Sequence, residues 1–246
     1  MTGKRKKPAA AEPLRVMALG AHPDDVELCC AGTLARCAAR GDRVIIAVAA
    51  NGDSASFDLS TEELVRIRSR EARNAARVIG VEFIEMGLSD YRIDVNLENK
   101  KLFADAIRQA RPDVILTHYH TEYGSDHNNT FLLVRDAALA ATVPSIRTGR
   151  PALKRQPFLF MWEPLGGFAF VPEIYVDISE TMQAKRKMLA CHRSQRDWLK
   201  KHGGIDFQEY IEVAARYRGF QAGVRFAEGF VPLKNWAQIA PRPLLP

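Results

Sequence analysis

The chain of 246 residues is 47% hydrophobic and carries a formal net charge of +6. Its length and composition allow one domain with a full core, and no apolar run approaches the roughly 20 residues of a membrane-spanning helix. Four of the positive charges lie in residues 4–7, so the rest of the chain is nearly neutral, and no nucleic-acid-binding motif accompanies the charge.

The basic segment MTGKRKKPAAAEP predicts a disordered tail over residues 1–13. It also lacks the apolar stretch of a secretory signal. Export is therefore not expected, and we expect a cytoplasmic protein. Residues 14–246 contain no Pro/Gly/Ser-rich linker and are expected to form a single domain. The cysteines form no C-x-x-C pair, so neither a disulfide framework nor a structural zinc knuckle is indicated.

The first part of the chain alternates between strand and helix patterns. Short apolar runs predict strands at Leu14–Leu19, Arg43–Ala50, Val81–Met86 and Asp113–His118. Helical periodicity between and after them predicts helices at Val26–Arg40, Thr61–Ile79, Leu97–Ala110 and Asn128–Ala141. Arg43–Ala50 is apolar on both faces, which is typical of a central strand in a parallel sheet.

Beyond Pro151 the alternation becomes less regular. Strand patterns at 158–164 and 173–179 accompany helix patterns at Glu180–Cys191 and Phe207–Tyr217. Strand–helix alternation with short turns indicates an α/β fold. We therefore predict an open, mostly parallel Rossmann-like sheet flanked by helices, with an irregular C-terminal α+β extension.

Polar residues follow three of the predicted strands. They are His22–Asp25 after the first strand, Asn51–Asp53 after the second, and His118–His127 after DVILTH. Ligands of open α/β sheets bind outside the carboxyl ends of the strands. The three clusters are therefore expected to converge on a single site.

The first of these clusters favours a metal ion over a nucleotide. It lacks the G-x-G-x-x-G pattern that holds a pyrophosphate, and two adjacent carboxylates would repel phosphate. Carboxylates and imidazoles together suit a divalent transition ion such as Zn²⁺. His22 and Asp25 are three residues apart in a turn that enters a helix, close enough to bind one ion, which leaves Asp24 free of the metal.

A third ligand must come from the cluster after DVILTH. The candidates there are His118, His120, Glu122, Asp126 and His127. Two histidines and one aspartate with an open fourth position would make a catalytic zinc site. Water bound there has a pKa near ~7, and Asp24 is placed to take its proton. The alternative is a plain turn in which an aspartate caps the following helix, but a second His/Asp-rich cluster at another strand end weighs against it.

These residues also resemble a known family. The stretch AHPDDVELCCAGTLA is similar to the opening signature of the PIG-L/LmbE-like N-acetylglucosaminyl deacetylases. Later segments match the same family in order, and the resemblance extends from Leu14 to Phe230. The matching later segments are AANGD, RSREARNAARVIGV, GLSD, RPDVILTH followed by Asp126-His127, KMLACHRSQ and YRGFQAGVRFAEGF.

The resemblance implies a metal site and an activity. Carried over by position, His22, Asp25 and His127 are the zinc ligands, and Asp24 is the general base. In this family zinc-bound water attacks the carbonyl of an N-acyl amino sugar and releases a carboxylic acid and an amine. The expected protein is a zinc-dependent hydrolase, with another divalent transition metal as a substitute, acting on an N-acetyl or other N-acyl amino-sugar conjugate. Relatives also suggest a homo-oligomer.

One position departs from the family pattern. Many members have H-P-D-H before the third ligand, and the first histidine there assists the tetrahedral intermediate. Here the matching residues are Gly124, Ser125, Asp126 and His127, so that histidine is absent. Candidate oxyanion or substrate contacts are His118, His120, Arg68, Tyr91 and Asp126. Taken alone, the pattern around Arg68 reads as a helix-surface charge.

Two other functions are compatible with the same residues. The first is a hydratase or lyase that adds activated water to an unsaturated dicarboxylate, although such relatives are expected to depart from the Asp24-Asp25 pair that this chain keeps. The second is a non-catalytic sugar-binding module, in which replacement of Asp24 would leave function intact.

Overall fold

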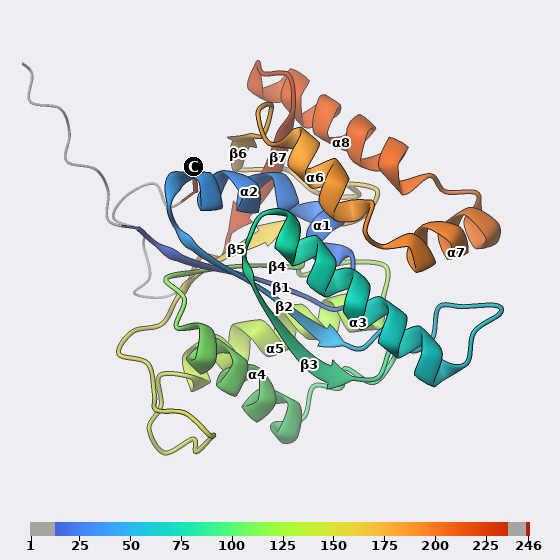
Figure 1. Ribbon diagram of the computed structural model, residues 1–246. Coiled ribbons are helices and arrows are strands. Elements are labelled where there is room, and N and C mark those ends of the chain that lie inside the picture. Colours follow the sequence, from blue (N-terminus) through green and yellow to red (C-terminus); the bar gives the residue numbers. More distant parts are fainter. Residues whose placement is uncertain (1–12, 236–244) are drawn as a thin grey trace, which may run out of the picture.

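The structure, a computed structural model, describes residues 13–235 and 245–246 (Figure 1). Apart from Pro13, the predicted basic tail lies outside the described residues, so its disorder stays a prediction. The strands are β1 (Arg15–Gly20), β2 (Arg43–Ala50), β3 (Glu82–Leu88), β4 (Val114–Thr117), β5 (Phe158–Trp162), β6 (Ile174–Asp177) and β7 (Ala227–Pro232).

All of these strands belong to one sheet of order β3-β2-β1-β4-β5-β7-β6. The strands from β3 to β5 are parallel to their neighbours, whereas β7 runs antiparallel to both β5 and β6. The predicted open, mostly parallel α/β sheet is therefore confirmed. Because the chain proceeds from β1 to β2 and β3 on one side and continues with β4 and β5 on the other, the strand order reverses beside β1.

Helices cover both faces of the sheet (Figure 1). One face carries α4 and α5, whose apolar side chains pack with those of Met17, Ile45 and Ile115. The other carries most of the remaining helices over Val16, Val44 and Val114. The helices are α1 (Asp25–Cys29), α2 (Ala31–Arg40), α3 (Thr61–Val78), α4 (Leu97–Ala110), α5 (Ser125–Ala140), α6 (Met182–Leu189), α7 (Arg193–Gly203) and α8 (Phe207–Ala222).

The predicted helix Val26–Arg40 is two helices, and that prediction was wrong at its centre. Cys30 interrupts the helix with φ −141° and ψ 11°. A new helix starts behind it because the buried carboxylate of Glu228 accepts the Gly32 and Thr33 backbone N–H groups at 3.0 and 2.7 Å. An anion at the first turn stabilises a helix N-terminus. The break keeps α1 short, so its first residues stay beside the end of β1.

The C-terminal extension holds two elements that the sequence pattern did not predict. α7 follows α6 after a short break at His192, and β7 inserts between β5 and β6. Neither segment has a clear periodic pattern of apolar residues, and β7 pairs with strands that are remote from it in the sequence. No helix among the described residues is long and apolar enough to cross a membrane.

Candidate metal centre and its cavity

The loop between β1 and α1 carries the first half of the site. Asp24 occupies the N-cap position of α1 with φ +119°, in the left-handed region that costs a non-glycine residue about 1–3 kcal/mol. Its side chain makes no capping hydrogen bond, so the interpretation of this loop as a plain capped turn is wrong. Asp25 instead turns back on the loop, where its Oδ2 accepts the His22 backbone N–H at 2.6 Å.

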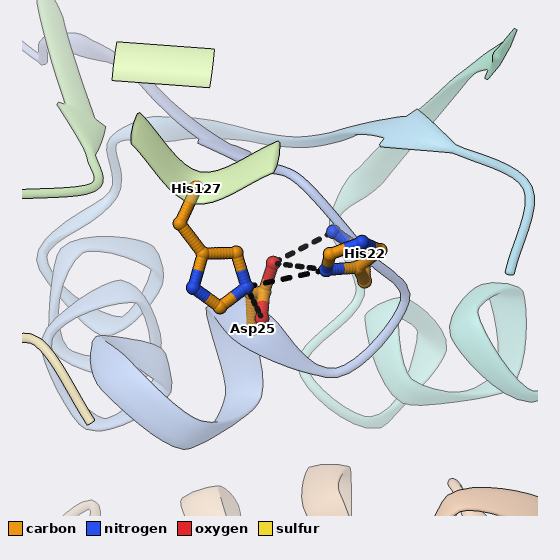
Figure 2. Close-up of side chains that lie close together, drawn as sticks. All are labelled: His22, Asp25 and His127. Carbon is orange, nitrogen blue, oxygen red and sulfur yellow. Dashed lines mark hydrogen bonds and ion pairs between the residues drawn. The ribbon is translucent and has the colours of Figure 1, made fainter. Parts of the chain in front are cut away.

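Three side chains converge from two distant segments (Figure 2). His22 and Asp25 follow β1, and His127 comes from the first turn of α5, after β4. His22 Nδ1 lies 3.2 Å from His127 Nε2 and 3.6 Å from Asp25 Oδ2, and His127 Nε2 lies 3.4 Å from Asp25 Oδ1. We call these three residues the ligand cluster. It stands where the strand order reverses, the place at which such sheets bind ligands.

The spacing within the ligand cluster fits a zinc ion. Four ligand atoms arranged tetrahedrally at about 2.0–2.1 Å from Zn²⁺ lie roughly 3.3 Å from one another. The three observed separations of 3.2, 3.4 and 3.6 Å fall close to that value. Two imidazole nitrogens and a carboxylate oxygen are also a donor set that zinc accepts in catalytic sites. The residues present therefore fit the ion that the donor types suggest.

The charges around the ligand cluster also favour a cation. Burial lowers the pKa of His127, but the carboxylates of Asp25 and Glu122 outweigh it and raise that pKa to about 11. Burial likewise lowers the pKa of His22, and hydrogen bonds with Asp126 and Asp25 raise it to about 9. In the metal-free protein the surrounding carboxylates thus hold a positive charge on both imidazoles, and a bound cation would satisfy the same carboxylates.

Asp24 lies beside the ligand cluster without joining it. Burial raises the pKa of Asp24, the nearby Arg68 guanidinium partly offsets this, and the pKa is about 6. Arg68 Nη2 is 3.9 Å from Asp24 Oδ1 and donates a hydrogen bond to the Pro23 carbonyl at 2.9 Å. Arg68 is only 2% exposed, so the interpretation of this residue as a helix-surface charge is wrong. Arg68 thus stabilises the strained loop through its hydrogen bond to the Pro23 carbonyl.

Gly52, in the motif AANGD, leaves room for that arginine. It has φ +76°, and a Cβ added there would lie 2.5 Å from Arg68 Nε. The arginine cannot easily move away, because its Nη atoms are held by Pro23 O and Gly52 O. Asp90 also keeps the turn in place by accepting the Gly52 backbone N–H at 3.0 Å.

Gly52→Ala is therefore expected to destabilise the protein by about 1–3 kcal/mol from backbone strain and by more from the overlap with Arg68. Thermal unfolding of the metal-free protein measures the loss. Gly80→Ala is the matched control, because Gly80 also has a positive φ of 68° but an added Cβ there meets no atom within 4 Å. Equal losses in the two variants would contradict the role given to the Gly52–Arg68 contact.

An open cavity of about 810 Å³ lies over the ligand cluster. Of the candidate contacts, Arg68, Tyr91 and Asp126 line it, whereas His118 and His120 are not among the lining residues. His118 is buried behind the cluster, and the exposed His120 pairs with Thr121 at 2.8 Å. The other lining residues are His22, Asp24, Asp25, Leu28, Ser54, Ala55, Asp90, Tyr123, Gly124, Ser125, His127, Leu165, Gln195, Trp198 and Leu199.

Gly124 leaves this part of the cavity open. Its φ is −106°, and an added Cβ would meet only His127 Cγ, at 4.0 Å. A methyl group would therefore fit at this position. Asp126, two residues further, accepts the Tyr91 backbone N–H at 2.7 Å and lies 3.0 Å from His22 Nε2. It holds the first histidine of the ligand cluster from the side opposite Asp25.

Sequence reasoning missed the role of two buried residues near the site. His192 is fully buried, and its ring nitrogens make no hydrogen bond. Its Nε2 lies 3.4 Å from the Glu27 carboxylate on α1. Glu122 was considered only as one more carboxylate of its cluster. Its side chain is in fact 1% exposed and contacts two histidines. No local pattern distinguishes these residues from surface ones.

The chain is similar to known deacetylases. A family model described as PIG-L, GlcNAc-PI de-N-acetylase, matches residues 17–138. A diacetylchitobiose deacetylase of Thermococcus kodakarensis is 27% identical over 232 residues, which cover 89% of this chain and 83% of that protein.

Solved structures share the fold. The N,N′-diacetylchitobiose deacetylase of Pyrococcus horikoshii, in complex with an inhibitor, superposes with a TM-score of 0.79 at 25% identity, over 90% of this chain and 84% of that one. The 4-carboxy-2-hydroxymuconate hydratase of Pseudomonas putida superposes with a TM-score of 0.77 at 20% identity, over 92% and 98%. The second likeness concerns the fold alone.

Proposed function

Because residues 17–138 belong to the PIG-L family of GlcNAc-PI de-N-acetylases, we propose that this protein is a metal-dependent amide hydrolase. Its substrate is an N-acyl amino sugar, in the first instance an N-acetylated one, joined to a further group. The metal is Zn²⁺ or another divalent transition ion, held by His22, Asp25 and His127, and Asp24 is the general base.

One observation carries this proposal. Two imidazole nitrogens and the two oxygens of one carboxylate, with separations of 3.2–3.6 Å between residues, line a cavity, and a buried carboxylate outside this set stands next to them. A site that merely stored a metal ion would need neither the open cavity nor the strained Asp24. The relatives with deacetylase activity support the same conclusion.

The reaction divides between the ion and the protein. A divalent ion bound by the ligand cluster would lower the pKa of water and polarise the acyl carbonyl. Asp24 takes the proton of the attacking water and delivers it to the leaving nitrogen, so that amide and water become a carboxylic acid and an amine. Arg68 keeps the Asp24 carboxyl in place through the Pro23 carbonyl and favours its charged form.

The cavity suits an uncharged sugar conjugate better than an anion. Aromatic rings of Tyr91, Tyr123 and Trp198 line it, and such rings offer flat apolar faces to the C–H groups of a sugar. Its carboxylates include those of Asp24, Asp25, Asp90 and Asp126, which repel anions. Arg68 is the single guanidinium or ammonium group among the described lining residues, and it is buried and already bonded to two carbonyls.

This charge pattern separates the hydrolase from the hydratase alternative. A dicarboxylate would bring two negative charges into a cavity whose single guanidinium is engaged, so that the bound metal ion would be the one cation left to pair with a substrate carboxylate. Binding would leave at least one substrate carboxylate without a partner, at a cost of several kcal/mol if buried. The fold likeness to a hydratase therefore does not extend to the chemistry that we propose for this cavity.

The test is an assay of the zinc-loaded protein against a panel of N-acyl amino sugars and their glycosides. Release of free amine and of the carboxylic acid in equal amounts is the expected result. The same preparation is offered an unsaturated dicarboxylate, for which no hydration is expected. Turnover of the diacid without amine release from the panel would replace the hydrolase proposal by the hydratase.

A further inference from the structure

A buried carboxylate lies behind the ligand cluster, outside the cavity. Glu122 Oε2 is 2.5 Å from His127 Nδ1 and 3.0 Å from His118 Nδ1, while its Oε1 accepts the Leu165 backbone N–H at 3.1 Å. Its backbone is fixed by a reciprocal pair of 2.8 Å hydrogen bonds with the Asn128 side chain. Glu122 is thus held at both ends, and one of its oxygens is shared by two imidazoles.

This group is too tight to be a second metal site. His118, Glu122 and His127 do offer three ligand atoms close together. However, ligand atoms at about 2.0–2.2 Å from one zinc ion in tetrahedral geometry lie roughly 3.3 Å apart. The 2.5 Å separation of Glu122 Oε2 from His127 Nδ1 leaves no space for an ion bound to both. The contacts are instead those of one carboxylate paired with two imidazoles.

The position of the protons follows from the backbone. The Ala21 N–H donates to His118 Nε2 at 3.0 Å, so that nitrogen is an acceptor. The His118 proton therefore lies on Nδ1 and is donated to Glu122 Oε2. Both oxygens of Glu122 face N–H groups, Oε2 that of His118 and Oε1 that of Leu165, so the group acts as a hydrogen-bond acceptor on both oxygens.

A carboxylate facing His127 Nδ1 places the ring proton on that nitrogen. The contact is an ion pair that lies off the best hydrogen-bond direction. When the ring carries a single proton, as a metal-binding histidine must, Nε2 is left with its lone pair directed at His22 and Asp25. Metal-binding histidines commonly have such a carboxylate on the second nitrogen, and loss of it typically weakens metal binding 10–100-fold.

From these contacts we infer that Glu122 is the positioning residue of the metal site. It selects the tautomer in which His127 Nε2 is the ligand atom. Through His118 and the Ala21 N–H it also joins the half of the site that follows β4 to the half that follows β1. The inference rests on the proposed metal site and names a residue outside the ligand set.

The experiment compares zinc affinity in wild type and in Glu122→Gln, by titrating metal-free protein against a competing chelator. The amide keeps the shape but has no negative charge, and its NH2 group must face either both histidines or the Leu165 N–H, so we expect a 10–100-fold weaker affinity. Glu71→Gln is the matched control. Glu71 is also buried and binds Ser194 at 3.1 and 2.6 Å, away from the cluster, and its replacement should leave the affinity unchanged.

A second measurement needs no variant. Proton–nitrogen correlation spectra of the zinc-loaded wild type should show His127 protonated at Nδ1 and unprotonated at Nε2. Wild-type affinity in Glu122→Gln, an equal loss in Glu71→Gln, or a His127 proton on Nε2 would overturn the inference. A wild type that binds no zinc would instead overturn the proposed function, so the two failures are distinguishable.

Discussion

Asp24→Asn should lower turnover by roughly 10²–10⁴-fold while the metal content of the protein stays the same. The amide has nearly the shape of the carboxyl group but cannot accept the proton of the attacking water. Asp24 is outside the ligand cluster, so its loss removes a proton acceptor and not a ligand. Amine release under saturating substrate gives the turnover, and elemental analysis of the same sample gives the metal content.

Asp113→Asn is the control for this variant. Asp113 is also an aspartate paired with arginine, with Arg15 Nη2 at 3.0 Å. It directly precedes β4, however, and so lies at the amino ends of the parallel strands, whereas the site lies at their carboxyl ends. Its replacement should leave turnover almost unchanged. Full activity of Asp24→Asn would remove Asp24 from the mechanism. It would support either a non-catalytic binding module or a hydrolase with another residue as general base.

The pH dependence of the wild type tests the same residue. Burial raises the pKa of Asp24, with Arg68 opposing, to about 6 in the metal-free protein. A general base acts only as the carboxylate, so activity is present above this pKa and is lost as the pH falls through it. A bound cation favours the carboxylate and moves the acid limb of kcat/KM to pH 6 or below. An acid limb centred well above pH 6 would indicate another base.

His127→Ala should abolish both metal binding and turnover. The substitution removes the single ligand that α5 contributes, and two ligands from one short loop hold zinc far more weakly than three. It also leaves the buried Glu122 carboxylate without one of its two imidazole partners. Elemental analysis should therefore find little metal, and amine release should fall to the limit of detection.

His120→Ala separates this effect from the loss of any histidine in the same segment. His120 is exposed, bonds to Thr121 and does not line the cavity, so its variant should retain metal and activity. A His127→Ala protein with a full complement of metal would contradict the ligand assignment. A metal-free wild type with undiminished activity would contradict the whole metal-dependent mechanism.

Much of the fold could be predicted from local patterns. The strands before β5 and the helices α3 and α4 were predicted to within a few residues. The strands are short apolar runs, of which β1, β2 and β4 are buried on both faces, and the helices show the period of one buried face in the sequence. The stop at Cys30 and the strand β7 were not predicted, since the first depends on Glu228 and the second on pairing with β5 and β6. Both partners are remote in the chain.

The site divides in the same way. The sequence by itself predicted that His22 and Asp25 lie together as half of the candidate metal site, because both residues are in one tight turn at the end of a strand. Only the tertiary structure decided which of the residues after β4 faces them. It brought His127 Nε2 to within 3.2 Å of His22 and placed His118 behind the cluster, with its Nε2 3.3 Å from Asp25 Oδ2.

The burial of charged residues was likewise decided by tertiary contacts. Arg68, Glu122 and His192 stand in segments whose spacing is typical of exposed helices or loops. A charged side chain is buried only where groups of opposite charge or hydrogen-bond partners meet it. For Arg68 these are the Pro23 and Gly52 carbonyls, and for Glu122 they are two histidines. The partners of Arg68 come from distant segments, and those of Glu122 are brought together by the fold of the loop between β4 and α5, which no periodic pattern records.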